Sequence, residues 1–163
     1  MKEQLYGKAE ALVRALVSCG GTVATAESCT GGMIAKLITD VPGSSAAFVG
    51  GVVSYTNRIK TGILGVDPAI IEEYTEVSLA CAKAMAEGAR LRLGSDFALS
   101  TTGYAGPGGG TEKDPVGTVY IGVSTAKETV AERFAAPVNA TRSEVREAAA
   151  ARAVELLLQV LDE

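Results

Sequence analysis

The sequence predicts an α/β fold, a three-layer α/β/α sandwich around a mixed sheet of roughly five strands. Helical segments alternate with short β-rich apolar runs along the chain, and the last two runs lie close enough together for an antiparallel hairpin. No linker, repeat or low-complexity tract interrupts the 163 residues, 47% of which are apolar and 21% charged. We therefore expect residues 1–163 to form one domain of ordinary globular composition.

The chain begins with an amphipathic helix over about residues 3–19. Charged residues are interspersed among its apolar ones, which distinguishes it from a signal peptide. Gly20 and Gly21 end the helix, because glycine commonly follows a helix C-terminus. We expect its apolar stripe to consist of Leu5, Leu12, Leu16 and Cys19.

Two strands follow, over residues 22–27 and 46–55, with a helix of about residues 30–39 between them. The second strand is β-branched and apolar on both faces, which is typical of a buried central strand. Its glycines, Gly50 and Gly51, indicate a bulge or a close approach of a neighbouring backbone.

Three helices are expected in the middle of the chain, over residues 56–64, 67–74 and 77–93. Asp67 is suited to cap the second of them, and Pro68 to occupy its first position. The third is rich in alanine and is closed by a glycine.

The C-terminal part predicts a strand over residues 96–103, a glycine-rich loop over 104–116 and a hairpin of strands 117–125 and 128–136. A final helix over residues 141–161 begins with a Thr-x-x-Glu capping box.

Composition excludes several functional classes. The net charge of −4 argues against a nucleic-acid binder, which needs a clustered basic face, although a few arginines still suffice for a small anionic ligand. No apolar run approaches the roughly 18 residues of a membrane span. With three cysteines, no CxxC pair and no histidine, we expect no metal site. The odd cysteine count indicates reduced thiols and a cytoplasmic location.

The junction "AESCTGG" places small polar side chains where a strand passes into a helix. Ser28 is a candidate nucleophile there, and the free N–H groups around Thr30, Gly31 and Gly32 are suited to an oxyanion or a phosphate. The alternative is that Ser28 or Thr30 merely caps the helix. Cys29 is a rival nucleophile, or simply a small buried hydrophobic residue.

A nucleophilic serine needs a base, and the absence of histidine excludes a Ser-His-Asp triad. The remaining options are a lysine, a carboxylate or a tyrosine. The candidate lysine is Lys60, which follows a strand by one helical turn and acts as a base only if desolvation or a neighbouring cation lowers its pKa. Tyr55 ends the same strand and is suited to share a proton or to orient the pair. The alternative is an ordinary solvated lysine.

The loop after the third strand is the second candidate region. Thr102, Gly103, Ala105 and Gly106 offer a hydroxyl, N–H donors and close backbone approach to an amide or a phosphate. The loop fits neither GxGxxG nor a Walker A motif, and a long connection without a ligand is the alternative.

Arg142 and Arg146 lie in the first turns of the last helix, where cations oppose the helix dipole. A bound anion would reverse that penalty and accept bidentate hydrogen bonds. The alternative is that Glu144 and Glu147 neutralise them on a solvated face.

Taken together, the motifs resemble one family. The segments that carry the resemblance are "TVATAESCTGG", "ITDVPGSS", "GGVVSYTNRIKTGILGV", "STTGYAGPGGG" and "NATRSEVREAAA". They are similar to the CinA C-terminal domain family, whose bacterial enzymes are nicotinamide-nucleotide amidases of the PncC type. The resemblance covers the chain from about Gly21 to Leu161.

The resemblance implies hydrolysis of the carboxamide of nicotinamide mononucleotide to nicotinate mononucleotide and ammonia, in pyridine-nucleotide salvage. It implies Ser28 as nucleophile and Lys60 as base, with Tyr55 nearby, and neither a metal nor a cofactor. Arg142 is the first choice to anchor the substrate phosphate and Arg146 the second. The partner is then a small nucleotide, with no nucleic acid or membrane; a homo-oligomer, dimer or trimer, is compatible with the sequence.

Two other functions remain open at this point. One is a non-catalytic nucleotide-binding or regulatory module of the CinA type, which needs no neutral lysine. The other is a phosphatase or pyrophosphatase that acts on the same ligand, a class that commonly depends on Mg²⁺.

Overall fold

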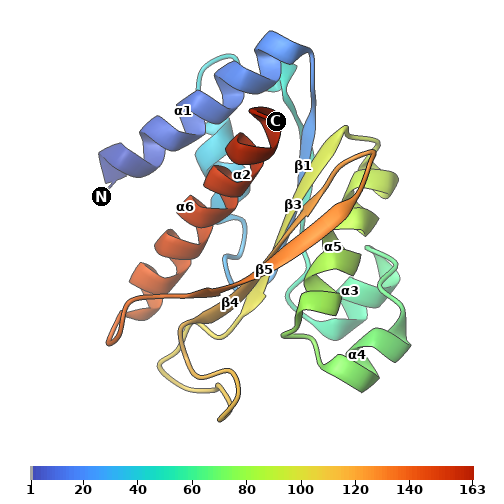
Figure 1. Ribbon diagram of the computed structural model, residues 1–163, viewed down its shortest axis with the longest axis vertical. Helices are drawn as coiled ribbons and strands as arrows, with labels where there is room; N and C mark the ends of the chain where they lie inside the picture. The colour runs from blue at the N-terminus through green and yellow to red at the C-terminus, as the bar shows by residue number, and fades with distance from the viewer. Residues whose placement is uncertain (1) are drawn as a thin grey trace.

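The computed structural model describes residues 2–163 and contains a five-stranded mixed sheet between two layers of helices (Figure 1). The strand order is β2-β1-β3-β4-β5. In chain order the elements are α1 (Lys2–Cys19), β1 (Val23–Glu27), α2 (Met33–Thr39), a 3₁₀ turn (Ser44–Ala46), β2 (Phe48–Val53), α3 (Asn57–Gly62), α4 (Pro68–Tyr74), α5 (Leu79–Leu93), β3 (Phe97–Gly103), β4 (Thr118–Ser124), β5 (Thr129–Ala135) and α6 (Arg142–Leu161).

The two helical layers confirm the predicted three-layer sandwich. Helices α1, α2 and α6 pack together on one face of the sheet, while α3, α4 and α5 lie on the other, with α5 in contact with every strand (Figure 1). Strands β1, β2 and β3 are parallel because helices connect them, whereas loops connect β3, β4 and β5, which pair antiparallel. Within residues 2–163, no helix is both long and apolar enough to cross a membrane.

The side-chain caps predicted at the starts of α4 and α6 are both confirmed. The carboxylate of Asp67 accepts a hydrogen bond from the N–H of Ala69 at 2.9 Å, and Pro68 is the first residue of α4. The capping box at the start of α6 is also present. These contacts lie within a few residues of one another, so the sequence alone could predict them.

The stripe predicted for α1 is right at Leu5, Leu12 and Leu16, which are buried, and wrong at Cys19, which is exposed. The buried stripe ends at Leu16, because α1 ends at Cys19 and the chain then turns at Gly20 toward β1.

Strand β2 lies at the edge of the sheet, so its predicted central position is wrong. Its residues alternate between partly buried and exposed, and Val49 and Val53 are 45% and 51% exposed. The central position next to it belongs to β1, all of whose residues are buried. Both features expected of its glycines are present. The register with β1 shifts between the pairs Val23–Phe48 and Ala24–Gly50, and a Cβ atom on Gly51 would lie 2.2 Å from the Oγ1 and 3.4 Å from the carbonyl oxygen of Thr25.

The parallel strands fix the place of the site. Strands β1, β2 and β3 end at the same edge of the sheet, where Glu27 pairs with Val53 on one side and with Thr101 on the other. In open α/β sheets, ligands bind in the crevice outside such carboxyl ends. The candidate residues that follow these strands therefore come together there.

Candidate active site

The side chains of Ser28 and Lys60 are in direct contact, although they lie 32 positions apart in the sequence. The Nζ atom of Lys60 lies 3.1 Å from the Oγ of Ser28 and donates to the backbone carbonyls of Ser54 at 2.8 Å and Tyr55 at 3.3 Å. Helix α3 starts four residues after β2 ends, so its Lys60 reaches back over the ends of β1 and β2. Only 1% of Lys60 is exposed.

Burial favours the neutral form of this lysine. Desolvation lowers the pKa of Lys60 below its ordinary value of 10.5, and the nearby Cys81 and Glu76 oppose the shift only in part. A neutral amine can accept the proton of Ser28 across the same contact in which it now donates. The pair therefore has the arrangement of a nucleophile and its general base.

Ser28 is not the N-cap of the following helix. Helix α2 begins at Met33 rather than near Thr30, and its N-cap, Gly32, has a left-handed φ of 99° and no side-chain cap. The buried carboxylate of Glu27 caps the helix instead, accepting from the N–H groups of Ile34 at 2.8 Å and Ala35 at 3.1 Å. This leaves the Oγ of Ser28 to Lys60.

Thr30 and Arg146 hold the turn between β1 and α2. The Oγ1 of Thr30 is fully buried and hydrogen-bonds to Glu27 at 2.6 Å and to the Oγ1 of Thr101 at 2.7 Å. The guanidinium of Arg146 donates to the carbonyls of Cys29 and Thr30, each at 3.0 Å. Both side chains are thus occupied within the protein.

The thiol of Cys29 is a poor rival to Ser28. The residue is buried, and desolvation raises its pKa from 9.0 to about 12. Because the thiolate is the reactive form, this thiol stays protonated and inert near neutral pH.

A cavity of about 300 Å³ opens beside Ser28 and Lys60. Seven of the expected site residues line it, namely Ser28, Tyr55, Lys60, Thr102, Gly103, Ala105 and Arg142. Among residues 2–163, five others from the same expectation are not part of its lining, namely Thr30, Gly31, Gly32, Gly106 and Arg146. The structure therefore brings together the serine, the lysine, the end of β3 and the start of α6.

Arg142 faces the cavity as a cation without a carboxylate partner in the described chain. It donates to the carbonyl of Gly106 at 2.7 Å and to the hydroxyl of Tyr55 at 3.3 Å. Glu144 does not neutralise it, because the Glu144 carboxylate accepts from the N–H of Thr141 in the capping box at 2.8 Å. Tyr55 is 59% exposed and contacts Lys60 through its backbone carbonyl.

Free backbone donors complete the site. In residues 2–163, the N–H groups of Cys29 and Ala105 donate no hydrogen bond to another residue, and both residues line the cavity. The absence of a side chain at Gly103 lets β4 approach, since a Cβ there would lie 2.4 Å from the carbonyl of Thr118. Such N–H groups can stabilise a developing oxyanion.

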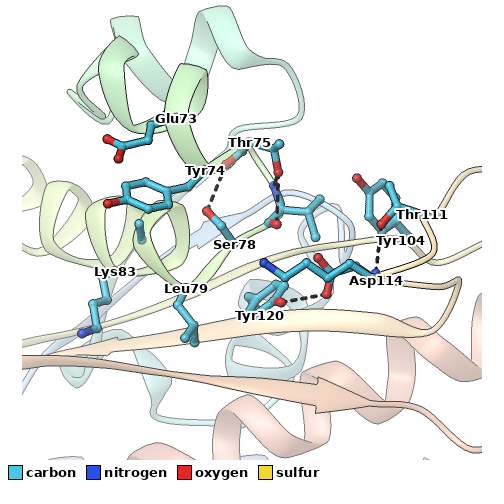
Figure 2. Close-up of a pocket in the computed structure, with 13 residues that line it drawn as sticks. Glu73, Tyr74, Thr75, Ser78, Leu79, Lys83, Tyr104, Thr111, Asp114 and Tyr120 are labelled. Atoms are coloured by element: carbon cyan, nitrogen blue, oxygen red, sulfur yellow. Dashed lines mark hydrogen bonds between the residues drawn. The ribbon is translucent and has the colours of Figure 1, made fainter.

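A second cavity of about 620 Å³ lies on the far side of the glycine-rich loop (Figure 2). The loop is anchored there by Asp114, which accepts hydrogen bonds from the hydroxyl of Tyr120 at 2.7 Å and from Arg133 at 3.2 Å. Tyr104 and Val77 line both cavities and so form the wall between them. Figure 2 shows the Tyr104 side chain on the loop side of the second cavity.

Sequence reasoning missed two acidic residues. Glu27 holds the turn as described, and Glu76, in the connection between α4 and α5, lines the cavity of Ser28 and Lys60. The sequence signal for Glu76 is weak: an acid directly before the buried Val77 and the N-cap Ser78. In the described part of the chain, no cluster of three or more His, Cys, Asp or Glu side chains could hold a metal ion.

Comparison with known proteins places these features in a family. The family sequence model of the CinA C-terminal domain matches residues 6–161. A CinA-like protein from Myxococcus xanthus is 47% identical over 154 residues, which cover 94% of this chain and 36% of that protein. One from Leptospira borgpetersenii is 56% identical over 119 residues, which cover 73% of this chain and 28% of that protein. The chain thus spans about a third of the length of these relatives.

Solved structures share this fold over nearly all of the chain. The competence/damage inducible protein CihA from Agrobacterium tumefaciens superimposes with a TM-score of 0.93 at 35% identity, covering 98% of this chain and 96% of its own. A CinA superfamily protein from Klebsiella pneumoniae gives 0.92 at 29% identity, covering 97% and 98%. From the sequence match and the shared fold, we conclude that the chain belongs to the CinA C-terminal domain family.

Proposed function

We propose that the protein is an amidase that hydrolyses the carboxamide of nicotinamide mononucleotide to nicotinate mononucleotide and ammonia. The observation that carries the proposal is the contact of 3.1 Å between the Oγ of Ser28 and the Nζ of a buried lysine whose pKa desolvation lowers. Nucleophile, base and free N–H donors are what amide hydrolysis requires. The substrate itself comes from the resemblance to the amidases of this family.

The first half of the reaction forms an acyl-enzyme. Neutral Lys60 takes the proton of Ser28 as the Oγ attacks the carboxamide carbon. The N–H groups of Cys29 and Ala105 are suited to stabilise the oxyanion of the tetrahedral intermediate. When the C–N bond breaks, the Lys60 ammonium returns the proton to the leaving nitrogen, and ammonia departs.

The second half regenerates the enzyme. Lys60, neutral again, takes a proton from a water molecule that attacks the ester carbon. The carboxylate product leaves as the proton passes to the Ser28 oxygen. Every proton thus moves through one amine.

The substrate phosphate needs a cation, and Arg142 is the better candidate. It faces the cavity and has no carboxylate partner within the described residues, whereas Arg146 is bound to two loop carbonyls. A guanidinium can hold a phosphate through two parallel hydrogen bonds.

All three cysteines are free thiols, which supports a reducing compartment, and we propose the cytoplasm.

The test is ammonia release from nicotinamide mononucleotide. Ser28→Ala and Lys60→Ala are each expected to lower kcat by about 10³-fold or more, because each removes a group that acts in the chemical step. Ser18→Ala and Lys36→Ala, which change an exposed serine and an exposed lysine, serve as matched controls and should keep full activity.

Near-normal turnover in either site variant would contradict the Ser-Lys assignment. Tight binding of the nucleotide by the unchanged protein without ammonia release would contradict the amidase function altogether. That second outcome would favour a nucleotide-binding or regulatory module.

A further inference from the structure

One carboxylate in the cavity of Ser28 and Lys60 has no partner. Among the described residues that line this cavity, Glu76 is the only Asp or Glu. Within residues 2–163, its carboxylate takes part in no ion pair and no hydrogen bond. Glu76 is half-buried and lines the cavity, so its carboxylate is open to a ligand there. A ligand of opposite charge would supply the partner that the protein does not.

The backbone fixes Glu76 at the cavity. Its carbonyl accepts a hydrogen bond from the buried hydroxyl of Thr102 at 2.6 Å, which ties it to the end of β3. The preceding residue, Thr75, has a φ of 70° and a ψ of 169°, a conformation that residues with a side chain rarely adopt. On the other side, Ser78 caps α5 by accepting from the N–H of Cys81 at 3.1 Å.

The charge of Glu76 acts on the reacting pair. Its field raises the pKa of Lys60, against the larger effect of burial. Arg142 lines the same cavity and carries the opposite charge. Beside Lys60, whose pKa burial lowers, the cavity presents one carboxylate and one guanidinium to a ligand.

We propose that Glu76 is a specificity-determining residue that binds the pyridinium cation of the substrate ring. The inference rests on the proposed function. In nicotinamide mononucleotide a cationic ring bears the carboxamide, and an anionic phosphate lies at the other end of the molecule. Glu76 and Arg142 match this pair of charges, so the cavity favours a zwitterionic pyridinium nucleotide over neutral carboxamides.

The test compares two ligands that differ in ring charge. Reduced nicotinamide mononucleotide keeps the carboxamide, ribose and phosphate, but its dihydropyridine ring is neutral. In Glu76→Gln we expect the KM for nicotinamide mononucleotide to rise about tenfold, because the substitution removes the charge and keeps the size. The inhibition constant of the reduced nucleotide, measured as a competitor in the same assay, should change less than about twofold.

Two control variants isolate the charge. Glu76→Asp keeps it and should retain most of the affinity. Glu73→Gln removes a nearby exposed carboxylate that lines the neighbouring cavity (Figure 2) and should change neither constant. The melting temperature of Glu76→Gln should equal or exceed that of the unchanged protein, since the carboxylate it loses is unpaired.

Removal of the Glu76 charge also lowers the pKa of Lys60 further, which reduces repulsion between that amine and a cationic ring and so opposes the expected rise in KM. A rise in the ratio of the two constants therefore reports the loss of the Glu76 charge itself. If both constants change by the same factor, or neither changes, the role of Glu76 is overturned while the amidase function stands. If the unchanged protein releases no ammonia, the function falls and this inference falls with it.

Discussion

At the residue scale, the burial of Lys60 away from solvent lowers the stability of the fold. Lys60 is among the largest fully buried side chains, and its amine is satisfied by two carbonyls and a hydroxyl rather than by a carboxylate. Such partners serve a neutral amine as well as a charged one, whereas burial penalises only the charged form. The lowered pKa of Lys60 that results is what the proposed role of general base requires.

Replacement of Lys60 by methionine tests that trade. The pKa of Lys60 is lowered in the folded state, so between that lowered pKa and about 10.5 the unfolded chain holds a proton that the folded chain lacks. The stability of the unchanged protein therefore rises with pH in this window, by at most about 1.4 kcal/mol per pH unit, and falls as the pH drops through the lowered pKa. Lys60→Met removes this dependence and is expected to be the more stable form near neutral pH.

Urea unfolding of both proteins at several pH values measures the effect. The free energy of unfolding of the unchanged protein should rise relative to that of Lys60→Met as the pH approaches about 10.5. Lys36→Met, which removes an exposed lysine, is the control. A difference between Lys60→Met and the unchanged protein that stays constant with pH would contradict the burial argument.

Residue types could predict part of this site. With no histidine in the chain, a serine after a strand and a lysine one helical turn after the next strand were the available pair. The roles of Glu27, Glu76 and Arg146 could not be predicted, because each depends on a turn or a helix that is distant or undefined in the sequence. Arg146, for example, reaches the carbonyl of Cys29 across 117 positions.

At the element scale, strand β2 shows how a glycine decides packing. The missing side chain of Gly51 lets β2 lie against Thr25 in β1, whose buried Oγ1 has no hydrogen-bond partner in residues 2–163. Glycine lowers intrinsic strand stability, so its presence here reflects close approach. The apolar composition of β2 predicted a central strand, and this was wrong because composition cannot show whether a strand has a neighbour on both sides.

Gly51→Ala is expected to destabilise the fold by about 1–3 kcal/mol, because the new methyl group would overlap the Oγ1 of Thr25. Gly50→Ala is the matched control: a Cβ there meets no atom within 4 Å, so its effect should be neutral or slightly stabilising. Thr25→Ala combined with Gly51→Ala removes the overlap and should recover most of the loss. Thermal unfolding measures all three, and equal effects at the two glycines would contradict the packing argument.

At the scale of the whole molecule, the site exists only when the fold is complete. Ser28 comes from the end of β1, Lys60 from α3 on one face of the sheet, and Arg142 from α6 on the other face (Figure 1). Alternating elements could predict the sandwich and the edge where the parallel strands end. They could not predict which arginine faces the cavity, because that depends on how α6 packs on α2. Whether the protein forms a dimer or a trimer stays a prediction.

Sensitivity to EDTA distinguishes amidase from phosphatase chemistry, which a shared fold cannot do. In the proposed reaction the chain supplies the nucleophile, the base and the oxyanion donors, so no step waits for a metal. After dialysis against EDTA, ammonia release from nicotinamide mononucleotide should stay within about twofold of the untreated rate, and no inorganic phosphate should appear. Enzymes that cleave phosphate esters or pyrophosphates commonly use Mg²⁺ to stabilise charge on the transferred group. Ammonia release that is lost with EDTA and restored by Mg²⁺ would contradict a mechanism carried by Ser28 and Lys60 alone. Release of inorganic phosphate would instead indicate that the cavity cleaves the phosphate ester of the same nucleotide.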